Sequence, residues 1–210
     1  MKLDNASLDA ILRLAPVIPV IAVQRLEDAL PLAQALVRGG LRVLEVTLRT
    51  PCALQALAAM RAVPGAVVGA GTVLDAHQYQ AAVEAGAQFV VAPGLTPTLA
   101  RAAARHTVPL LPGAATASEV MRAREWGLTR LKFFPAQSSG GTASLKGWFS
   151  VFPEMRFCPT GGITEAIAPS YLALPNVSCV GGSWPMPEDL VAAGQWADIE
   201  QRARLAAALR

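Results

Sequence analysis

The sequence predicts an α/β protein: a single-domain (β/α)8 TIM barrel over residues 1–210, with a short helix capping its amino-terminal mouth. Three observations predict this fold. The length of 210 residues suits one domain. Short apolar runs recur at a nearly even pitch of about 20 to 26 residues, and a helical pattern lies between each run and the next.

The apolar runs are continuous rather than alternating, which is typical of parallel strands covered on both faces. We expect strands at 17–23, 42–48, 66–71, 88–93, 108–113, 130–135, 156–162 and 178–183. A doubly wound open sheet is the alternative. It would need fewer strands, and "GAGTVL" lacks the third glycine of a dinucleotide-binding signature.

Start and stop signals define the helices between these strands. Gly39-Gly40 ends the first one, and "TASE" at 116–119 has the spacing of a capping box. Asp75, Thr96 with Pro97, and Thr50 with Pro51 mark further helix starts. Less regular helices are expected at 141–150, 164–173 and 187–208, and the capping helix at 4–14.

Composition excludes several classes of protein. Hydrophobic residues make up 53% and charged residues 16%, so a large core is expected. The net charge is +3 without a basic run, which argues against nucleic-acid binding. The three cysteines follow no disulfide pattern, the amino terminus is not a signal peptide, and no apolar run is long enough for a membrane. We expect a cytoplasmic protein.

Three ionisable residues stand out within or just after the strands, where active sites of such barrels form. Glu45 is the only acidic residue inside a predicted strand, and Arg49 follows that strand's end. A guanidinium can hold a carboxylate with two hydrogen bonds. The alternatives are a buried packing ion pair for Glu45 and a salt bridge at the barrel rim for Arg49.

Lys132 lies in "RLKFFP", one of only three lysines in the chain. Strand alternation turns Lys132 and Phe134 to one face and Leu131 and Phe133 to the other. Apolar walls and a second cation nearby, expected from Arg49, would disfavour the ammonium form and free the amine as a nucleophile. The alternative is a lysine whose amine reaches out to the barrel mouth.

Two glycine pairs end the seventh and eighth strands, in "PTGGI" and "VGGSW". Gly161, Gly162, Gly181 and Gly182 would let backbone N–H groups approach a phosphate, and the hydroxyl of Ser183 could add to them. The alternative to phosphate binding is that these glycines only allow tight turns.

Thr72, Pro93 and Thr160 also fall at strand ends and could line the same pocket, although each could simply belong to a turn or a helix start. The two histidines, His77 and His106, lie in predicted helices away from strand ends. We therefore expect no metal site, no serine triad and no cofactor. An amine, a carboxylate, an arginine and a phosphate-binding loop together predict Schiff-base aldolase chemistry.

The motifs "PVIAV", "LEVTLRTP", "VGAGTVL", "FVVAPG", "LPGAATASEVMRAREWG", "LKFFPA", "RFCPTGGI" and "VGGSW" resemble the 2-keto-3-deoxy-6-phosphogluconate (KDPG) aldolase family, from about residue 8 to residue 190. The resemblance implies a class I aldolase, usually a homotrimer. It implies cleavage of 2-dehydro-3-deoxy-6-phosphogluconate to pyruvate and glyceraldehyde 3-phosphate in the Entner–Doudoroff route, often with activity on 4-hydroxy-2-oxoglutarate.

Carried over by motif, the resemblance makes Lys132 the Schiff-base residue and Glu45 the general acid/base. Arg49, with Thr72, Pro93, Phe134 and Thr160, would hold the pyruvate end. The glycines of "TGGI" and "GGS", with Ser183, would hold the phosphate. Three alternatives remain: an aldolase for the galactonate epimer or for 4-hydroxy-2-oxoglutarate alone, a phosphosugar isomerase with Glu45 as base, and a non-catalytic phosphosugar-binding barrel.

Overall fold

Helices and strands alternate along the chain, and the computed structural model describes residues 5–209 of it. The strands are β1 (Val17–Ile21), β2 (Val43–Thr47), β3 (Val67–Gly71), β4 (Val90–Val91), β5 (Leu110–Leu111), β6 (Gly113–Ala114), β7 (Arg130–Phe133), β8 (Arg156–Pro159) and β9 (Val180–Gly182). The helices are α1 (Asn5–Leu12), the 3-10 helix η1 (Leu26–Asp28), α2 (Ala29–Arg38), α3 (Ala53–Arg61), α4 (Ala76–Glu84), α5 (Pro97–Ala103), α6 (Ala117–Glu125), α7 (Gly141–Val151), α8 (Ala168–Leu172), α9 (Glu188–Ala192) and α10 (Trp196–Ala207).

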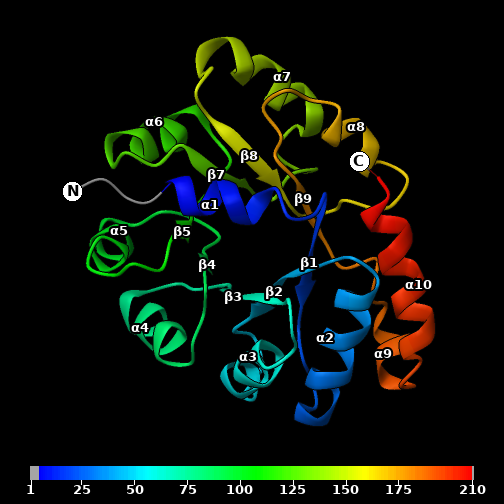
Figure 1. Ribbon diagram of the computed structural model, residues 1–210. Helices are drawn as coiled ribbons and strands as arrows, with labels where there is room; N and C mark the ends of the chain where they lie inside the picture. The colour runs from blue at the N-terminus through cyan, green and yellow to red at the C-terminus, as the bar shows by residue number, and fades with distance from the viewer. Residues whose placement is uncertain (1–4, 210) are drawn as a thin grey trace.

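The strands form parallel sheets with most of the helices outside them (Figure 1). A curled six-stranded sheet has the order β5-β4-β3-β2-β1-β9, and a three-stranded sheet has the order β6-β7-β8. Every strand pair is parallel, as predicted from the continuous apolar runs. The molecule is thus an α/β fold built on a parallel, curled sheet.

The strand pairing departs from the eight evenly paired strands of the prediction. The predicted fifth strand is divided at Pro112 into β5 and β6, which pair with different neighbours. Proline has no N–H to donate to a strand ladder, although the Pro112 carbonyl still accepts from the Lys132 N–H at 2.8 Å. On the other side, β8 and β9 are joined by two isolated bridges, Phe157 with Val177 and Thr160 with Gly181.

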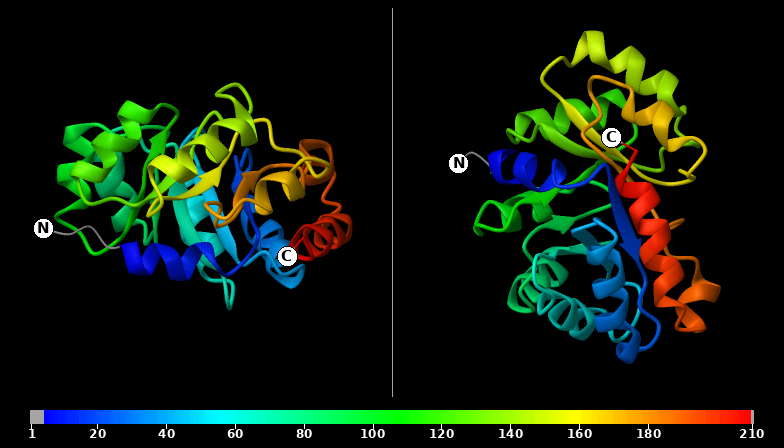
Figure 2. Two further views of the ribbon diagram at one scale, coloured as in Figure 1. Left: turned by 90° about the horizontal axis from the view of Figure 1, so that it is seen from above. Right: turned by 45° about the vertical axis from the view of Figure 1, so that its right-hand side comes forward.

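Two apolar layers hold the elements together. The larger layer lies between the strands and the surrounding helices and includes Leu131 and Phe133 of β7. The smaller layer takes side chains from both sheets and from α1, namely Leu8, Leu12, Ile18, Val43, Phe89, Val91, Leu111, Cys158 and Cys179. Helix α1 lies beneath the strands in Figure 2 (left), consistent with the predicted capping helix; Asp4, the first residue of its predicted range, lies outside the described residues.

Polar contacts fasten α1 to the amino-terminal end of β7. The Asn5 amide nitrogen donates to the Gly127 carbonyl at 2.8 Å, and its oxygen accepts from the Thr129 N–H at 2.9 Å. The Arg130 guanidinium forms a two-pronged ion pair with the Asp9 carboxylate. Helix α1 therefore fixes the strand that carries Lys132.

The predicted helix caps are largely confirmed. The side chains of Asp75, Thr96 and Thr116 each accept a hydrogen bond from the backbone N–H three residues later, at the starts of α4, α5 and α6. The capping box at Thr116 and Glu119 is complete. The N–H of Ala115 donates to the Glu119 carboxylate and, with Thr116, lowers the pKa of Glu119.

Three predicted helix boundaries were wrong. The helix predicted at 164–173 is the shorter α8, which begins at Ala168. Helix α3 begins at Ala53 rather than after Thr50, because residues 49–52 form a turn in which the Cys52 thiol donates to the Val23 carbonyl at 3.3 Å. The predicted helix at 187–208 is two helices, α9 and α10, separated at Gly194 with a φ of 66°. Helix α10 lies beside α2 (Figures 1 and 2), and Arg38 pairs with Glu200 at 2.7 Å.

We expect Leu12→Ala to lower the free energy of unfolding by about 2–5 kcal/mol, because it leaves a cavity in the smaller apolar layer. Leu12 is 1% exposed, whereas Leu14, two residues later, is 40% exposed. The matched control Leu14→Ala should change the free energy of unfolding by no more than about 0.5 kcal/mol. Urea unfolding followed by circular dichroism measures both, and equal losses would contradict the role given to α1.

Candidate active site

A buried ion pair joins the two sheets. The amine of Lys132, on β7, lies 2.9 Å from the Glu45 carboxylate, on β2. The two side chains are 7% and 4% exposed. Leu131 and Phe133 point into the outer apolar layer, so the predicted alternation along β7 is confirmed and the amine points inward. The amine does not reach out to solvent, which removes the structural alternative for Lys132.

Small and aromatic neighbours shape the space around this pair. The ring centroid of Phe134 lies 5.5 Å from the Lys132 amine, on the face that the sequence predicted. On β3, a Cβ atom added to Gly71 would lie 2.3 Å from a Glu45 carboxylate oxygen. Because Gly71 has no side chain, the space that a Cβ atom would fill is available to the Glu45 carboxylate.

Thr72 directly follows Gly71 at the end of β3 in an unusual conformation. Its φ of 57° makes it the one non-glycine residue in the left-handed region among residues 5–209. Such backbone conformations cost free energy and cluster at functional sites. Pro93 follows β4 and is half-buried, and a Cβ on Gly113 would lie 1.9 Å from its carbonyl oxygen.

Arg49 lies just past the end of β2 and is exposed. Its Nε donates to the Thr47 hydroxyl at 3.0 Å, and that hydroxyl donates to the Ile21 carbonyl at 2.8 Å. Within residues 5–209 it forms no ion pair or hydrogen bond with Lys132 or Glu45. The charged group in contact with the amine is the Glu45 carboxylate.

The two glycine loops lie side by side. Thr160, buried at the end of β8, bridges to Gly181 of β9. A Cβ on Gly181 would lie 2.3 Å from the Thr160 hydroxyl, so only glycine allows this approach. Gly161 and Gly162 have φ values of 102° and 75°, in the region that favours glycine.

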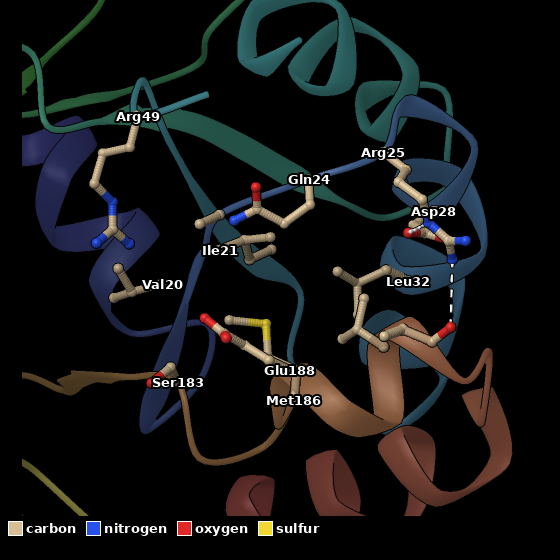
Figure 3. Close-up of a pocket in the computed structure, with 13 residues that line it drawn as sticks. Val20, Ile21, Gln24, Arg25, Asp28, Leu32, Arg49, Ser183, Met186 and Glu188 are labelled. Atoms are coloured by element: carbon tan, nitrogen blue, oxygen red, sulfur yellow. Dashed lines mark hydrogen bonds and ion pairs between the residues drawn. The ribbon is translucent and has the colours of Figure 1, made fainter. Parts of the chain in front are cut away.

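A cavity of about 500 Å³ opens between the segment that follows β1 and the segment that follows β9 (Figure 3). Its wall includes Arg49 and Ser183, two of the residues predicted from sequence. Val20 and Ile21 of β1 also line it, and Val20 is in register with Glu45 of β2. The other predicted residues, Lys132, Glu45, Thr72, Pro93, Phe134, Thr160 and the four glycines, do not line it.

Sequence reasoning missed most of the cavity wall. Gln24, Met186 and Glu188 face the cavity from the segments after β1 and β9 (Figure 3). Arg25 and Asp28 also line the cavity, and the Arg25 guanidinium donates two hydrogen bonds of 2.8 Å to the buried Asp28 carboxylate. The "RLED" spacing of opposite charges was a signal for this pair, but the cavity walls depend on how α9 folds back beside β1.

The described part of the chain contains no group of three His, Cys, Asp or Glu side chains that could hold a metal ion. Cys52 and Cys158 are free thiols. Between residues 5 and 209 there is also no helix with the length and apolar character needed to cross a membrane.

Comparison with known proteins places this geometry in a family. The sequence profile described as KDPG and KHG aldolase matches residues 8–202. The chain is 56% identical over 180 residues to 2-dehydro-3-deoxy-phosphogluconate aldolase of Zymomonas mobilis, covering 86% of each sequence. It is 51% identical over 205 residues to the KHG/KDPG aldolase of Escherichia coli, covering 97% of this chain and 96% of the relative.

Solved structures of KDPG aldolases have the same fold as this chain. The KDPG aldolase of Zymomonas mobilis with 3-phosphoglycerate superimposes with a TM-score of 0.91 at 52% identity, covering 96% of this chain and 95% of that one. The KDPG aldolase of Legionella pneumophila, with pyruvate captured as a covalent carbinolamine, gives a TM-score of 0.93 at 46% identity, covering 95% and 98%. This chain therefore belongs to the KDPG and KHG aldolase family.

Proposed function

We propose that the chain is a class I aldolase that cleaves 2-dehydro-3-deoxy-6-phosphogluconate to pyruvate and glyceraldehyde 3-phosphate, a step of the Entner–Doudoroff route, and that it also cleaves 4-hydroxy-2-oxoglutarate. The observation that carries the proposal is the buried amine of Lys132 with a carboxylate 2.9 Å away. The named activity of relatives about half identical to this chain supports it. So does the carbinolamine of the Legionella relative.

In the proposed cycle Lys132 is the nucleophile. Its amine adds to the keto carbon beside the substrate carboxylate, and loss of water gives an iminium. The iminium accepts the electron pair released when the bond one carbon further on breaks, so the aldehyde phosphate departs and an enamine remains. Protonation of the enamine and addition of water then release pyruvate and restore the amine.

Glu45 is the proposed general acid/base of this cycle. Its carboxylate is within the 2.6–3.2 Å at which a side chain can exchange a proton directly with its partner. It would take the proton of the attacking amine and supply it when hydroxide leaves the carbinolamine. It would then remove the proton of the distal hydroxyl, through a water, and return it to the enamine.

Binding roles follow the two ends of the substrate. We assign Arg49, with Thr72, Pro93, Phe134 and Thr160, to the pyruvate end. We assign Gly161, Gly162, Gly181, Gly182 and Ser183 to the phosphate. The guanidinium of Arg49 and the hydroxyl of Ser183, both in the cavity wall, support this assignment (Figure 3). The positive φ values of Gly161 and Gly162 also support it, since they make the tight turn in which glycine lets backbone N–H groups approach an anion.

We further propose that the two sheets are parts of one closed (β/α)8 barrel and that residues 1–210 form one domain. A single inner apolar layer shared by both sheets supports closure, as do the bridges between β8 and β9. We propose a homotrimer from the family resemblance and a cytoplasmic location from the cysteine usage. Sedimentation equilibrium would test the trimer.

Lys132→Ala should abolish covalent trapping of pyruvate by borohydride, because it removes the buried amine beside Glu45 on which the iminium is proposed to form. Wild-type protein should gain the mass of one reduced pyruvate, mapped to Lys132 by peptide mass spectrometry. The exposed Lys146 provides the matched control, and Lys146→Ala should trap pyruvate normally. Absence of trapping in the wild type would instead favour a phosphosugar isomerase or a binding protein.

Glu45→Gln should keep part of the adduct formation but slow turnover by about 10²- to 10⁴-fold, the usual contribution of general acid–base help. Pyruvate release from KDPG, from its galactonate epimer and from 4-hydroxy-2-oxoglutarate gives kcat and KM and ranks the substrates. Glu84→Gln, at an exposed helical glutamate, is the control. Wild-type turnover in Glu45→Gln would remove Glu45 from the mechanism.

Gly71→Ala should lower kcat by about 10²-fold, because displacing a catalytic group by about 1 Å has an effect of that size. The added methyl carbon would lie 2.3 Å from the Glu45 carboxylate oxygen and 2.6 Å from its Cγ, so the carboxylate must move. Gly147→Ala is the matched control, because nothing lies within 4 Å of its added Cβ. Equal activities in the two variants would show that the carboxylate tolerates displacement.

A further inference from the structure

The loops that follow β7 and β8 are joined by their backbones. The N–H of Ala136 donates to the Thr160 carbonyl at 2.8 Å, and the N–H of Gln137 donates to the Gly161 carbonyl at 3.1 Å. The glycine loop thus rests on residues 136 and 137, immediately after the strand that carries Lys132.

A side-chain hydrogen bond extends this contact to helix α8. The Tyr171 hydroxyl donates to the Gln137 side-chain oxygen at 2.7 Å. Tyr171 is 1% exposed, whereas Gln137 is exposed. Burial raises the pKa of Tyr171 above its ordinary value of 10.0, so the phenol stays a hydrogen-bond donor at neutral and mildly alkaline pH.

The position of the Gln137 side chain bears on the shape of the glycine loop. A Cβ on Gly162 would lie 2.9 Å from Gln137 Cγ, so the side chain packs directly over this glycine. Gly162 has a φ of 75°, and a glycine without a neighbour to confine it samples many backbone conformations. A fixed Gln137 therefore limits the conformations open to the loop.

We propose that Tyr171 is a positioning residue for the phosphate end of the substrate, acting through Gln137 on the loop of Gly161 and Gly162. The inference rests on the phosphate role proposed above for that loop. Tyr171 touches neither reacting group: within residues 5–209 neither it nor Gln137 forms a hydrogen bond or ion pair with Lys132 or Glu45. Its effect should thus be confined to the phosphate end.

The test compares a phosphorylated with an unphosphorylated substrate. Tyr171→Phe removes the hydroxyl but keeps the ring, and Gln137→Met removes the acceptor at an exposed position where the core is not disturbed. In each variant the KM for KDPG should rise about three- to tenfold, the size expected for one hydrogen bond. The kcat/KM for 4-hydroxy-2-oxoglutarate should stay within about twofold of wild type, as should pyruvate trapping.

A double variant and a control substitution sharpen the test. If both residues act through the same bond, Tyr171→Phe with Gln137→Met should be no worse than the more affected single variant. Tyr79→Phe is the matched control, because this buried tyrosine also donates its hydroxyl, to the Val108 carbonyl at 2.5 Å on another part of the chain. It should leave the preference between the two substrates unchanged.

Each outcome bears on one claim only. Equal losses on both substrates, no change on either, or additive effects in the double variant would overturn the role of Tyr171. A shift in preference caused by Tyr79→Phe would also overturn it, since any lost tyrosine hydroxyl would then have the same effect. A wild-type chain that cleaves neither substrate and traps no pyruvate would instead refute the proposed aldolase function itself.

Discussion

The rest of the structure depends on the ion pair between Glu45 and Lys132. Taking two such charges out of water costs several kcal/mol each, and their attraction offsets this only at close range and in good geometry. The 2.9 Å separation satisfies that condition, and it requires the middle of β2 and the middle of β7 to face each other. The arrangement of the strands and the chemistry of the site are thus set by one constraint.

Small residues and hydroxyls around the pair serve the same constraint. Gly71 has no side chain, and the Glu45 carboxylate occupies the space that a side chain would need. Thr47 links β1, β2 and Arg49, since its hydroxyl donates to the Ile21 carbonyl and accepts from the guanidinium. The result is an apolar interior that holds the reacting pair, beside a more polar cavity whose wall carries a cation and a hydroxyl.

The sequence was sufficient to predict the reacting residues but not how they are arranged. Lys132 and Glu45 could be identified because charged residues are rare inside apolar strands and strand alternation gives the direction of each side chain. Their direct contact could not be predicted, because they are 87 residues apart and the contact depends on how the sheets close.

The remaining errors also arise from tertiary contacts. Pro112 is visible in the sequence, but whether it interrupts a ladder depends on which neighbours pair on either side of it. Glu188 and Gln24 line the same cavity because α9 lies on the same side of the molecule as the end of β1. No local sequence pattern predicts that arrangement. Local signals therefore located the helix caps at Asp75 and Thr116 far better than the walls of the cavity.

The pairing of β1 with β9 has a consequence for synthesis on the ribosome. Strand β1 is synthesised long before β9, yet one of its edges pairs with residues 180–182 of β9. Until those residues are translated, an apolar strand shows open N–H and C=O groups, which is the feature that promotes aggregation of nascent chains.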